Sequence, residues 1–187
     1  MARALIVVDV QNDFCEGGAL GVKGGIAVAS NIHTLLTHEH GYDVVVATRD
    51  HHIDPGSHFS ENPDYVDSWP PHCVVGTDGV EFQEELHGIK FDGIFDKGED
   101  SAAYSGFEGR DHAQDDVSLA DFLRGRGVEA VDVVGIATDY CVRATALDAN
   151  EAGFDTSVLV RLTAAVHPAN TEDVVAELEE AGVWVAT

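Results

Sequence analysis

The chain has 187 residues, which is long enough for one well-buried domain and too short for two of ordinary size. Its 34 acidic residues against 10 lysines and arginines give a formal net charge of −24, which argues against nucleic acid as a partner because such a surface repels phosphate. No apolar run is long enough to span a bilayer and no signal-peptide pattern follows Met1, so we expect a cytoplasmic protein without a membrane partner. Three cysteines without a CxxC spacing also fit a reducing compartment.

The acidic residues are spread through ordinary globular sequence, so the charge does not indicate a disordered tail. We expect an adaptation to high intracellular salt (a halophilic protein), in which screening weakens the repulsion between carboxylates and their hydration keeps the protein soluble. The charge leaves open whether the chain is a monomer or a homo-oligomer.

Segments typical of strands alternate with segments of helical periodicity along the chain. Strands that are apolar on consecutive residues, such as 5–8 and 131–136, are typical of a parallel sheet covered on both faces. The sequence therefore predicts an α/β protein, a three-layer α/β/α sandwich with a mainly parallel six-stranded sheet. The expected strands are 4–10, 43–48, 93–96, 130–136, 156–160 and 183–185, and the expected helices are 26–38, 118–126, 139–152 and 170–181. We interpret 1–187 as a single domain, in which the long irregular region 49–91 is functional.

A cluster of metal-ligating side chains lies just after the second expected strand. Asp50, His52 and His58 are close in sequence, and His72 follows a rigid Trp-Pro-Pro run. Imidazole and carboxylate ligands with room for water are typical of open, catalytic metal sites. A single histidine among ten is more often solvated, and His51 taken alone is not expected to be a ligand. The four residues together predict a mononuclear metal site.

Three further reactive side chains lie at the carboxyl ends of expected strands, where open parallel sheets bind ligands. They are Asp9, Lys97 and Cys141. Each residue also has an ordinary structural explanation: Asp9 could cap a turn, Lys97 could be a solvated surface lysine, and Cys141 could be a small core residue. Cys141 lies near the start of an expected helix, where the helix dipole and a nearby ammonium lower a thiol pKa. The set predicts acyl transfer through a thioester, with Asp9 as base for Cys141, and with the backbone N–H groups of Ala137 and Cys141 as oxyanion donors.

Several motifs in this order resemble the nicotinamidase/pyrazinamidase group of the isochorismatase-like cysteine hydrolases, nearly end to end. They are residues 6–14 (IVVDVQNDF), 50–59 (DHHIDPGSHF), 68–73 (SWPPHC), 97–98 (KG), 103–107 (AYSGF) and 134–142 (VGIATDYCV). The resemblance implies the Rossmann-like fold of that superfamily and a metal-dependent amidohydrolase that converts nicotinamide to nicotinate and ammonia in NAD salvage. Hydrolysis of pyrazinamide to pyrazinoate is a further reaction that it allows. It also implies the same catalytic residues, Asp9, Lys97 and Cys141, and the same metal ligands, Asp50, His52, His58 and His72.

The resemblance adds details that the residues alone do not give. It implies one divalent ion per chain, with zinc favoured and iron or manganese as the alternatives, which binds the pyridine nitrogen directly or through water. It implies a cis peptide between Ile136 and Ala137. The substrate ring would lie among Phe14, Leu20, Trp69, Tyr104 and Tyr140.

Two features depart from the family pattern. Some pyrazinamidases of this group carry histidine where this chain has Tyr140, which puts pyrazinamide in more doubt than nicotinamide. The polar stretch 110–116 is expected to be a variable surface loop.

Three other functions compete with this interpretation. Hydrolysis of another small amide, such as a carbamoyl or ureido compound, fits the thiol, but relatives with such substrates generally lack the full metal-ligand set. Isochorismate ether hydrolysis would leave Cys141 without a task. An idle binding protein would be expected to lack one of Asp9, Lys97 or Cys141, and all three are present.

Overall fold

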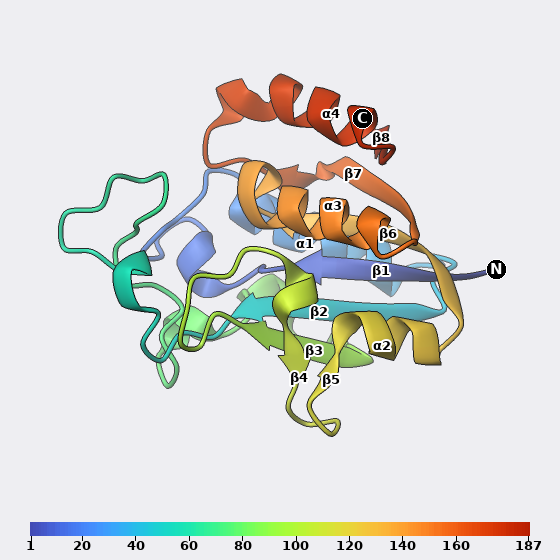
Figure 1. Cartoon of the computed structure of the whole chain (residues 1–187), viewed down its shortest axis with the longest axis horizontal. Helices are drawn as coiled ribbons and strands as arrows, with labels where there is room; N and C mark the ends of the chain where they lie inside the picture. The colour runs from blue at the N-terminus through green and yellow to red at the C-terminus, as the bar shows by residue number, and fades with distance from the viewer.

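The sheet of this protein runs through the whole molecule, and six of its eight strands are parallel. The computed structural model describes residues 1–187. Its strands are β1 (Ala2–Val8), β2 (Val44–Asp50), β3 (Gly93–Lys97), β4 (Arg110–Asp111), β5 (Val117–Ser118), β6 (Val128–Ile136), β7 (Asp155–Ala164) and β8 (Trp184–Ala186), in the order β5-β4-β3-β2-β1-β6-β7-β8 (Figure 1). The neighbouring pairs β3–β2, β2–β1, β1–β6, β6–β7 and β7–β8 are parallel, whereas β3–β4 and β4–β5 are antiparallel.

The two additional strands are the one difference from the expected six. Each has only two residues: β4 takes up the first two positions of the stretch 110–116 that the sequence predicts as a surface loop, and β5 follows that stretch. They form a short hairpin at the β3 edge of the sheet. A pairing this short leaves no periodic pattern in the sequence, so the six-strand expectation missed it.

Helices cover both faces of the sheet, as the sequence predicts. They are α1 (Gly25–Thr37), α2 (Leu119–Gly125), α3 (Arg143–Glu151) and α4 (Thr171–Glu180). Helix α1 packs on one face, while α2, α3 and α4 pack on the other (Figure 1). Strand β1 shows why both faces are apolar: Ala4, Ile6 and Val8 join one core, and Leu5 and Val7 join the other. The three-layer α/β/α prediction is confirmed.

Local signals account for several of the element ends. The Ser118 side chain accepts a hydrogen bond from the Asp121 N–H and caps α2, as predicted. Helix α3 begins later than expected, because Thr138–Val142 form a π-helical turn in front of it. Strand β1 ends at Val8 and not at Val10, because Asp9 takes a left-handed backbone conformation with φ 48°.

The region between β2 and β3 is irregular but hydrogen-bonded. It contains the 3-10 turns Gly56–His58, Asp78–Val80 and Glu84–Leu86. Isolated bridges join His52 to Val74 and Phe59 to Trp69, so the region folds back on itself beside the sheet. Its three histidines can therefore meet Asp50, the last residue of β2, although 22 positions separate Asp50 from His72.

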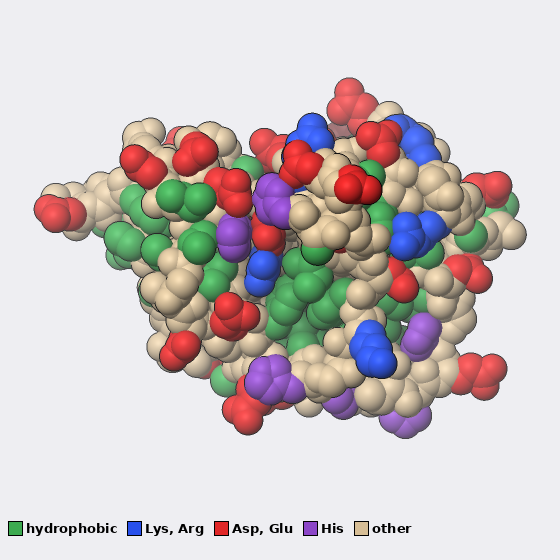
Figure 2. Space-filling view, turned by 90° about the horizontal axis from the view of Figure 1, so that it is seen from below, with side chains coloured by type: hydrophobic (Ala, Val, Ile, Leu, Met, Phe, Trp, Pro, Cys, Tyr) green, Lys and Arg blue, Asp and Glu red, His purple; other side chains and the backbone are tan.

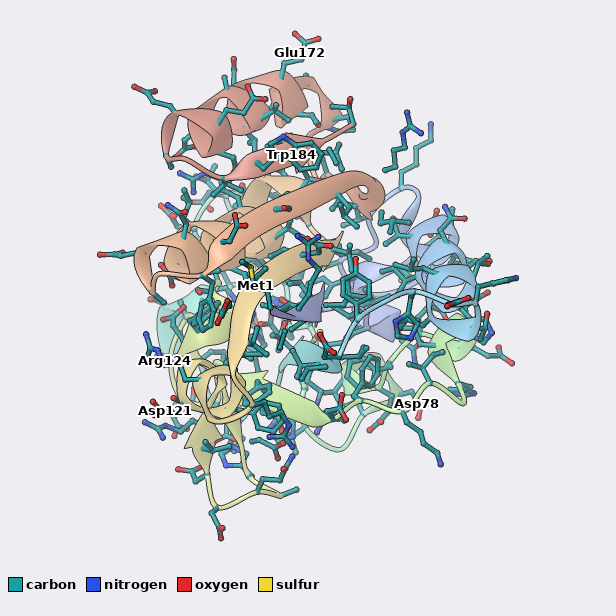
Figure 3. All side chains as sticks on the ribbon, turned by 90° about the vertical axis from the view of Figure 1, so that its right-hand side faces the viewer. Met1, Asp78, Asp121, Arg124, Glu172 and Trp184 are labelled. Carbon is teal, nitrogen blue, oxygen red and sulfur yellow. The ribbon has the colours of Figure 1, made fainter.

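The surface is dominated by acidic side chains. In Figure 2 they are scattered around one face, with few lysines or arginines among them. Glu172 on α4 points away from the molecule in Figure 3, and Trp184 on the edge strand β8 is 64% exposed. None of the helices combines the length and the apolar character that crossing a membrane would require.

Candidate active site

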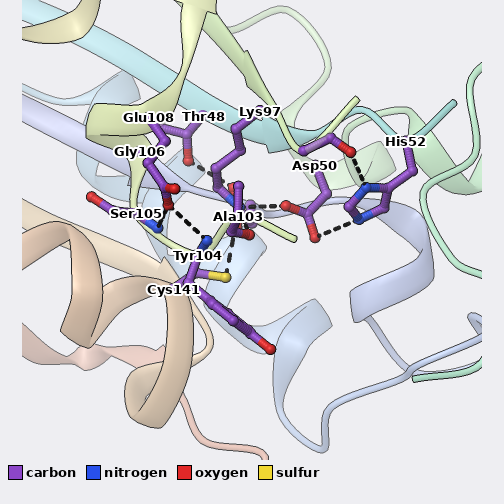
Figure 4. A network of polar contacts seen from close by, with 12 residues as sticks. Thr48, Asp50, His52, Lys97, Ala103, Tyr104, Ser105, Gly106, Glu108 and Cys141 are labelled. Atoms are coloured by element: carbon purple, nitrogen blue, oxygen red, sulfur yellow. Dashed lines mark hydrogen bonds and ion pairs between the residues drawn. The ribbon is translucent and has the colours of Figure 1, made fainter. Parts of the chain in front are cut away.

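A buried lysine stands at the centre of the site. Its ammonium Nζ lies 2.9 Å from Asp9 Oδ2, contacts Asp50 Oδ1, and lies 3.7 Å from Cys141 Sγ (Figure 4). Asp9, Asp50 and Lys97 expose 2% or less of their surface, and Cys141 exposes 7%. These residues come from the carboxyl ends of β1, β2, β3 and β6, which the parallel register brings to one edge. The structure thus brings together the three side chains expected to form the catalytic set.

Three histidine rings meet beside this lysine. Ligand atoms of His52, His58 and His72 all lie within 4.8 Å of one another, and all three side chains are buried. The fourth expected ligand, Asp50, contacts two of the rings, with Oδ2 at 3.3 Å from His52 Nε2 and 3.5 Å from His72 Nε2. His51 points elsewhere, with Nδ1 at 3.0 Å from Glu99 Oε1, as expected for a residue outside the set.

Backbone pairing within the irregular region brings the rings together. The His52 N–H donates to the Cys73 carbonyl at 3.0 Å, which places His52 beside His72. The Trp69 N–H donates to the His58 carbonyl at 2.8 Å, so the loop that carries His58 returns to the same place. Gly98 allows a further close approach: a Cβ there would lie 2.7 Å from the His52 ring, and its φ of 76° suits only glycine well.

The histidine set fits a divalent metal ion. The Nδ1 atoms of His52 and His72 face the carbonyls of Gly98 and Pro70, at 2.5 and 2.8 Å, which leaves each Nε2 free to bind a metal. His52 Nε2 and both ring nitrogens of His58 are buried without a hydrogen-bond partner. Burial, with help from His72 and His52, lowers the pKa of His58 to about 4, so its ring is neutral near pH 7 and has a lone pair to offer. Such orphaned nitrogens are costly unless a cation satisfies them.

Burial and the charge of Lys97 together shift the pKa values of the groups around this lysine. Burial alone would raise the pKa of Asp50, but Lys97 and the neighbouring His52 and His72 hold it well below its usual range. Burial raises the pKa of the Cys141 thiol well above normal, and Lys97 offsets this only in part. The sequence favoured a lowered thiol pKa at a helix start, which is wrong for the resting site, since burial outweighs the ammonium. A protonated thiol needs a base, and burial also raises the pKa of Asp9, which suits it to accept a proton.

A pocket lined mostly by apolar side chains opens onto the Cys141 thiol and onto Asp50, His58 and His72, as is typical of small-molecule sites. All five residues expected around a substrate ring line it, namely Phe14, Leu20, Trp69, Tyr104 and Tyr140. Tyr140 packs edge-on against Trp69, with 5.2 Å between ring centroids. The expected oxyanion donors also border this space, because Ala137 and Cys141 are lining residues and the Ile136–Ala137 peptide is cis as the resemblance implies.

Sequence reasoning missed several residues of the site. Val22, Ile136 and Val166 also line the pocket, and Thr48 Oγ1 donates to Asp9 Oδ1 at 2.7 Å. In a sequence, Val22, Ile136 and Val166 cannot be told apart from ordinary residues of the hydrophobic core. Thr48 follows an apolar run at a strand end, and only its position opposite β1 shows what it contacts.

Comparison with known proteins identifies the family of this chain. The isochorismatase domain family matches residues 3–187. A nicotinamidase/pyrazinamidase of Mycobacterium tuberculosis is 56% identical over 95% of this chain and 93% of its own length. The structure of the pyrazinamidase of Pyrococcus horikoshii in complex with zinc is 39% identical, has a TM-score of 0.84, and matches 100% of this chain and 99% of that chain. The structure of PnC1 of L. infantum in complex with nicotinate is 36% identical, has a TM-score of 0.86, and matches 100% of this chain and 92% of that chain. This chain is therefore a member of the isochorismatase family.

Proposed function

We propose that this protein is a metal-dependent cysteine amidase that hydrolyses nicotinamide to nicotinate and ammonia. The observation that carries the proposal is that the Cys141 thiol, its buried partners Lys97 and Asp9, and three histidines able to bind a metal lie together beside one pocket. The activity that the M. tuberculosis relative is named for, and the nicotinate and zinc held by the two solved structures, support the same reaction here. Pyrazinamide, whose ring keeps a nitrogen in the corresponding position, is a further substrate of the same site.

The chemistry at Cys141 proceeds in two halves. The thiol gives its proton to Asp9 as sulfur bonds to the amide carbonyl carbon; the C–N bond then breaks, Asp9 returns the proton to nitrogen, and ammonia leaves. Water next adds to the resulting thioester and gives a proton to Asp9. The C–S bond breaks, the sulfur regains the proton, and nicotinate departs. The N–H groups of Ala137 and Cys141 stabilise the oxyanion in each half, and Lys97 balances the charge on Asp9.

The metal ligands in this proposal are Asp50, His52, His58 and His72. When bound, a divalent ion supplies a Lewis-acid site for the pyridine nitrogen, directly or through water. Zinc is the first candidate because the P. horikoshii structure holds it, and iron and manganese suit the same ligands. The ring would then lie among Phe14, Leu20, Trp69, Tyr104 and Tyr140, with its amide directed at Cys141.

We further infer that residues 1–187 work as one domain, in which the region 49–91 supplies the metal ligands and part of the substrate pocket. The three unpaired cysteines support a reducing, cytoplasmic setting, where the nicotinate produced would return to NAD synthesis.

Product analysis with two amides tests the substrate assignment. Metal-loaded protein in high salt should form nicotinate and ammonia from nicotinamide in equal amounts. Benzamide, which has the amide but no ring nitrogen, should react at least about tenfold more slowly because one orienting contact is lost. Equal rates with benzamide would contradict the role of the metal. If no ammonia forms from nicotinamide, the substrate assignment fails and carbamoyl and ureido compounds become the next amides to test.

A further inference from the structure

The buried Gln11 side chain has no task in the reaction described above. It is fully inaccessible and lies two residues after Asp9. Its amide makes three hydrogen bonds: Nε2 donates to the carbonyls of Asp50 and Val80, both at 2.8 Å, and Oε1 accepts from the Asp50 N–H at 2.9 Å. A single side chain therefore holds both backbone groups of a candidate metal ligand.

The course of β1 explains why Asp50 needs this partner. Val8 pairs with Thr48, and the Asp9 N–H still donates to the Thr48 carbonyl at 3.1 Å. The chain then turns away, because Asp9 has φ 48° and the Gln11 N–H donates to the Asp9 carbonyl at 2.9 Å. The strand thus ends before its backbone can pair with Asp50. The Gln11 side-chain amide takes over the donor and the acceptor that a continuing strand would have offered.

The other side of Asp50 is held by regular pairing. Asp50 lies opposite Lys97 in the β2–β3 register, and the His51 N–H donates to the Lys97 carbonyl at 2.9 Å. The hydrogen bonds also fix the orientation of the Gln11 amide, since a reversed amide would place its NH₂ group against the Asp50 N–H. Asp50 is therefore held on both sides: by strand β3 on one side, and on the other by the Gln11 side chain, which occupies the place where β1 would have continued.

We propose that Gln11 is a positioning residue that sets Asp50 for its two contacts, with the metal ion and with Lys97. The carboxylate of Asp50 lies between these partners: Oδ1 contacts Lys97, while Oδ2 lies 3.3 and 3.5 Å from His52 and His72. A small shift of its backbone would misplace both oxygens. The proposal rests on the metal site of the proposed function, but not on which amide the enzyme hydrolyses. Groups that orient metal ligands in this way typically change metal affinity 10- to 100-fold.

Metal affinity of a Gln11→Met variant is the test, because methionine fills a similar volume without any of the three hydrogen bonds. Gln114→Met is the matched control. The Gln114 side chain also donates hydrogen bonds, from Nε2 to the Asp92 carbonyl at 3.0 Å and to Asp111 Oδ2 at 2.7 Å, but it lies in the exposed β4–β5 hairpin. Zinc affinity would be measured by competition with a chromophoric chelator, and folding by circular dichroism. We expect affinity to fall by at least about tenfold in Gln11→Met and to stay within about twofold of wild type in Gln114→Met.

A second variant guards against loss of folding. Gln11→Asn keeps an amide that is one methylene too short to reach Asp50, so its zinc affinity should also fall. Wild-type affinity in a folded Gln11 variant would overturn the proposal, and so would failure of both variants to fold, because Gln11 would then serve the fold and not the ligand. Weak zinc binding by the wild-type protein itself would instead refute the metal site, and absence of nicotinamide turnover with normal zinc binding would refute only the substrate.

Discussion

Lys97 and Asp50 form a buried ion pair that joins the candidate metal site to Cys141, the proposed nucleophile. Lys97 contacts one oxygen of Asp50 and lies 2.9 Å from Asp9, while the second oxygen of Asp50 faces His52 and His72. One cation therefore balances two carboxylates of different function. Because Asp50 and Lys97 are opposite each other in the β2–β3 register, the sheet itself holds this connection in place.

Replacing Lys97 by methionine should therefore damage both halves of the site. Two buried carboxylates would be left without their cation, which should cost about 3–5 kcal/mol of unfolding free energy. Turnover should fall by about 1,000-fold, because the positive charge that stabilises the Asp9 carboxylate and the Cys141 thiolate is lost. Urea unfolding and kcat/KM measure the two effects. Lys90→Met, at an exposed lysine, is the control, and a Lys97→Met protein with wild-type kcat/KM would refute the assigned role.

Metal binding should raise the thermal stability of the protein. An ion that binds only the folded chain adds about 2.7 kcal/mol when its free concentration is 100 times Kd, which corresponds to a rise in Tm of about 5–10 °C for a chain of this size. His58→Asn should lose most of this shift, while His112→Asn, at a half-exposed histidine outside the set, should keep it. The measurement is a melting curve with and without zinc. A full shift in His58→Asn would exclude His58 as a ligand.

Glu16 should cap α1 from a distance, and its contribution should depend on pH. Its two oxygens accept from the N–H groups of Gly24, at 2.6 Å, and Ile26, at 2.9 Å, where the capping position itself is a glycine. These backbone bonds, led by that from Ile26, lower the pKa of Glu16. The folded protein thus binds this proton less readily than the unfolded chain, so the stabilisation is present above the unfolded pKa of about 4.3 and is lost as pH falls through the lowered value.

Glu16→Gln should accordingly lower stability by about 0.5–1 kcal/mol near pH 7, because the carboxylate is exposed and screened. The difference in Tm between the two proteins should shrink as the pH is lowered toward 3. Glu39→Gln, beyond the end of α1, should show no such difference. A gap between wild type and Glu16→Gln that stays constant from pH 7 to pH 3 would contradict a charge-dependent cap.

Salt should stabilise this chain strongly if its charge reflects adaptation to high salt. With 34 acidic and 10 basic residues, self-repulsion is largest in dilute buffer and is screened as ionic strength rises. We expect Tm to rise between low and molar KCl, with far-ultraviolet circular dichroism showing fuller secondary structure at high salt. The same Tm and the same spectrum in both buffers would refute the adaptation.

Much of this fold could be predicted because its signals are local. Apolar runs marked the buried parallel strands, and Ser118 marked the start of α2. The end of β1 was wrong by two residues because the turn at Asp9 goes with a tertiary contact that the sequence does not show, the hydrogen bond from Thr48 to the Asp9 carboxylate. The β4–β5 hairpin is too short to leave a periodic pattern.

The candidate site was predictable to a different degree. Reactive side chains at strand ends and clustered histidines are visible in the sequence, so candidate metal ligands and catalytic residues could be named. Partners that act through hydrogen bonds are not: Gln11 reaches Asp50 across 39 positions, and only the fold shows that its amide replaces a strand. The raised pKa of the Cys141 thiol was also missed, because the cost of burial is set by the surroundings and not by the position in a helix.

Intact-protein mass spectrometry of acid-quenched turnover mixtures tests the central claim most directly. During turnover of nicotinamide, wild-type protein should show an added nicotinoyl mass, and peptide mapping should locate it on Cys141 and not on Cys15 or Cys73. Cys141→Ala should show neither the adduct nor ammonia release. Steady ammonia release by Cys141→Ala, or an acyl group on another residue, would contradict a thioester mechanism at Cys141.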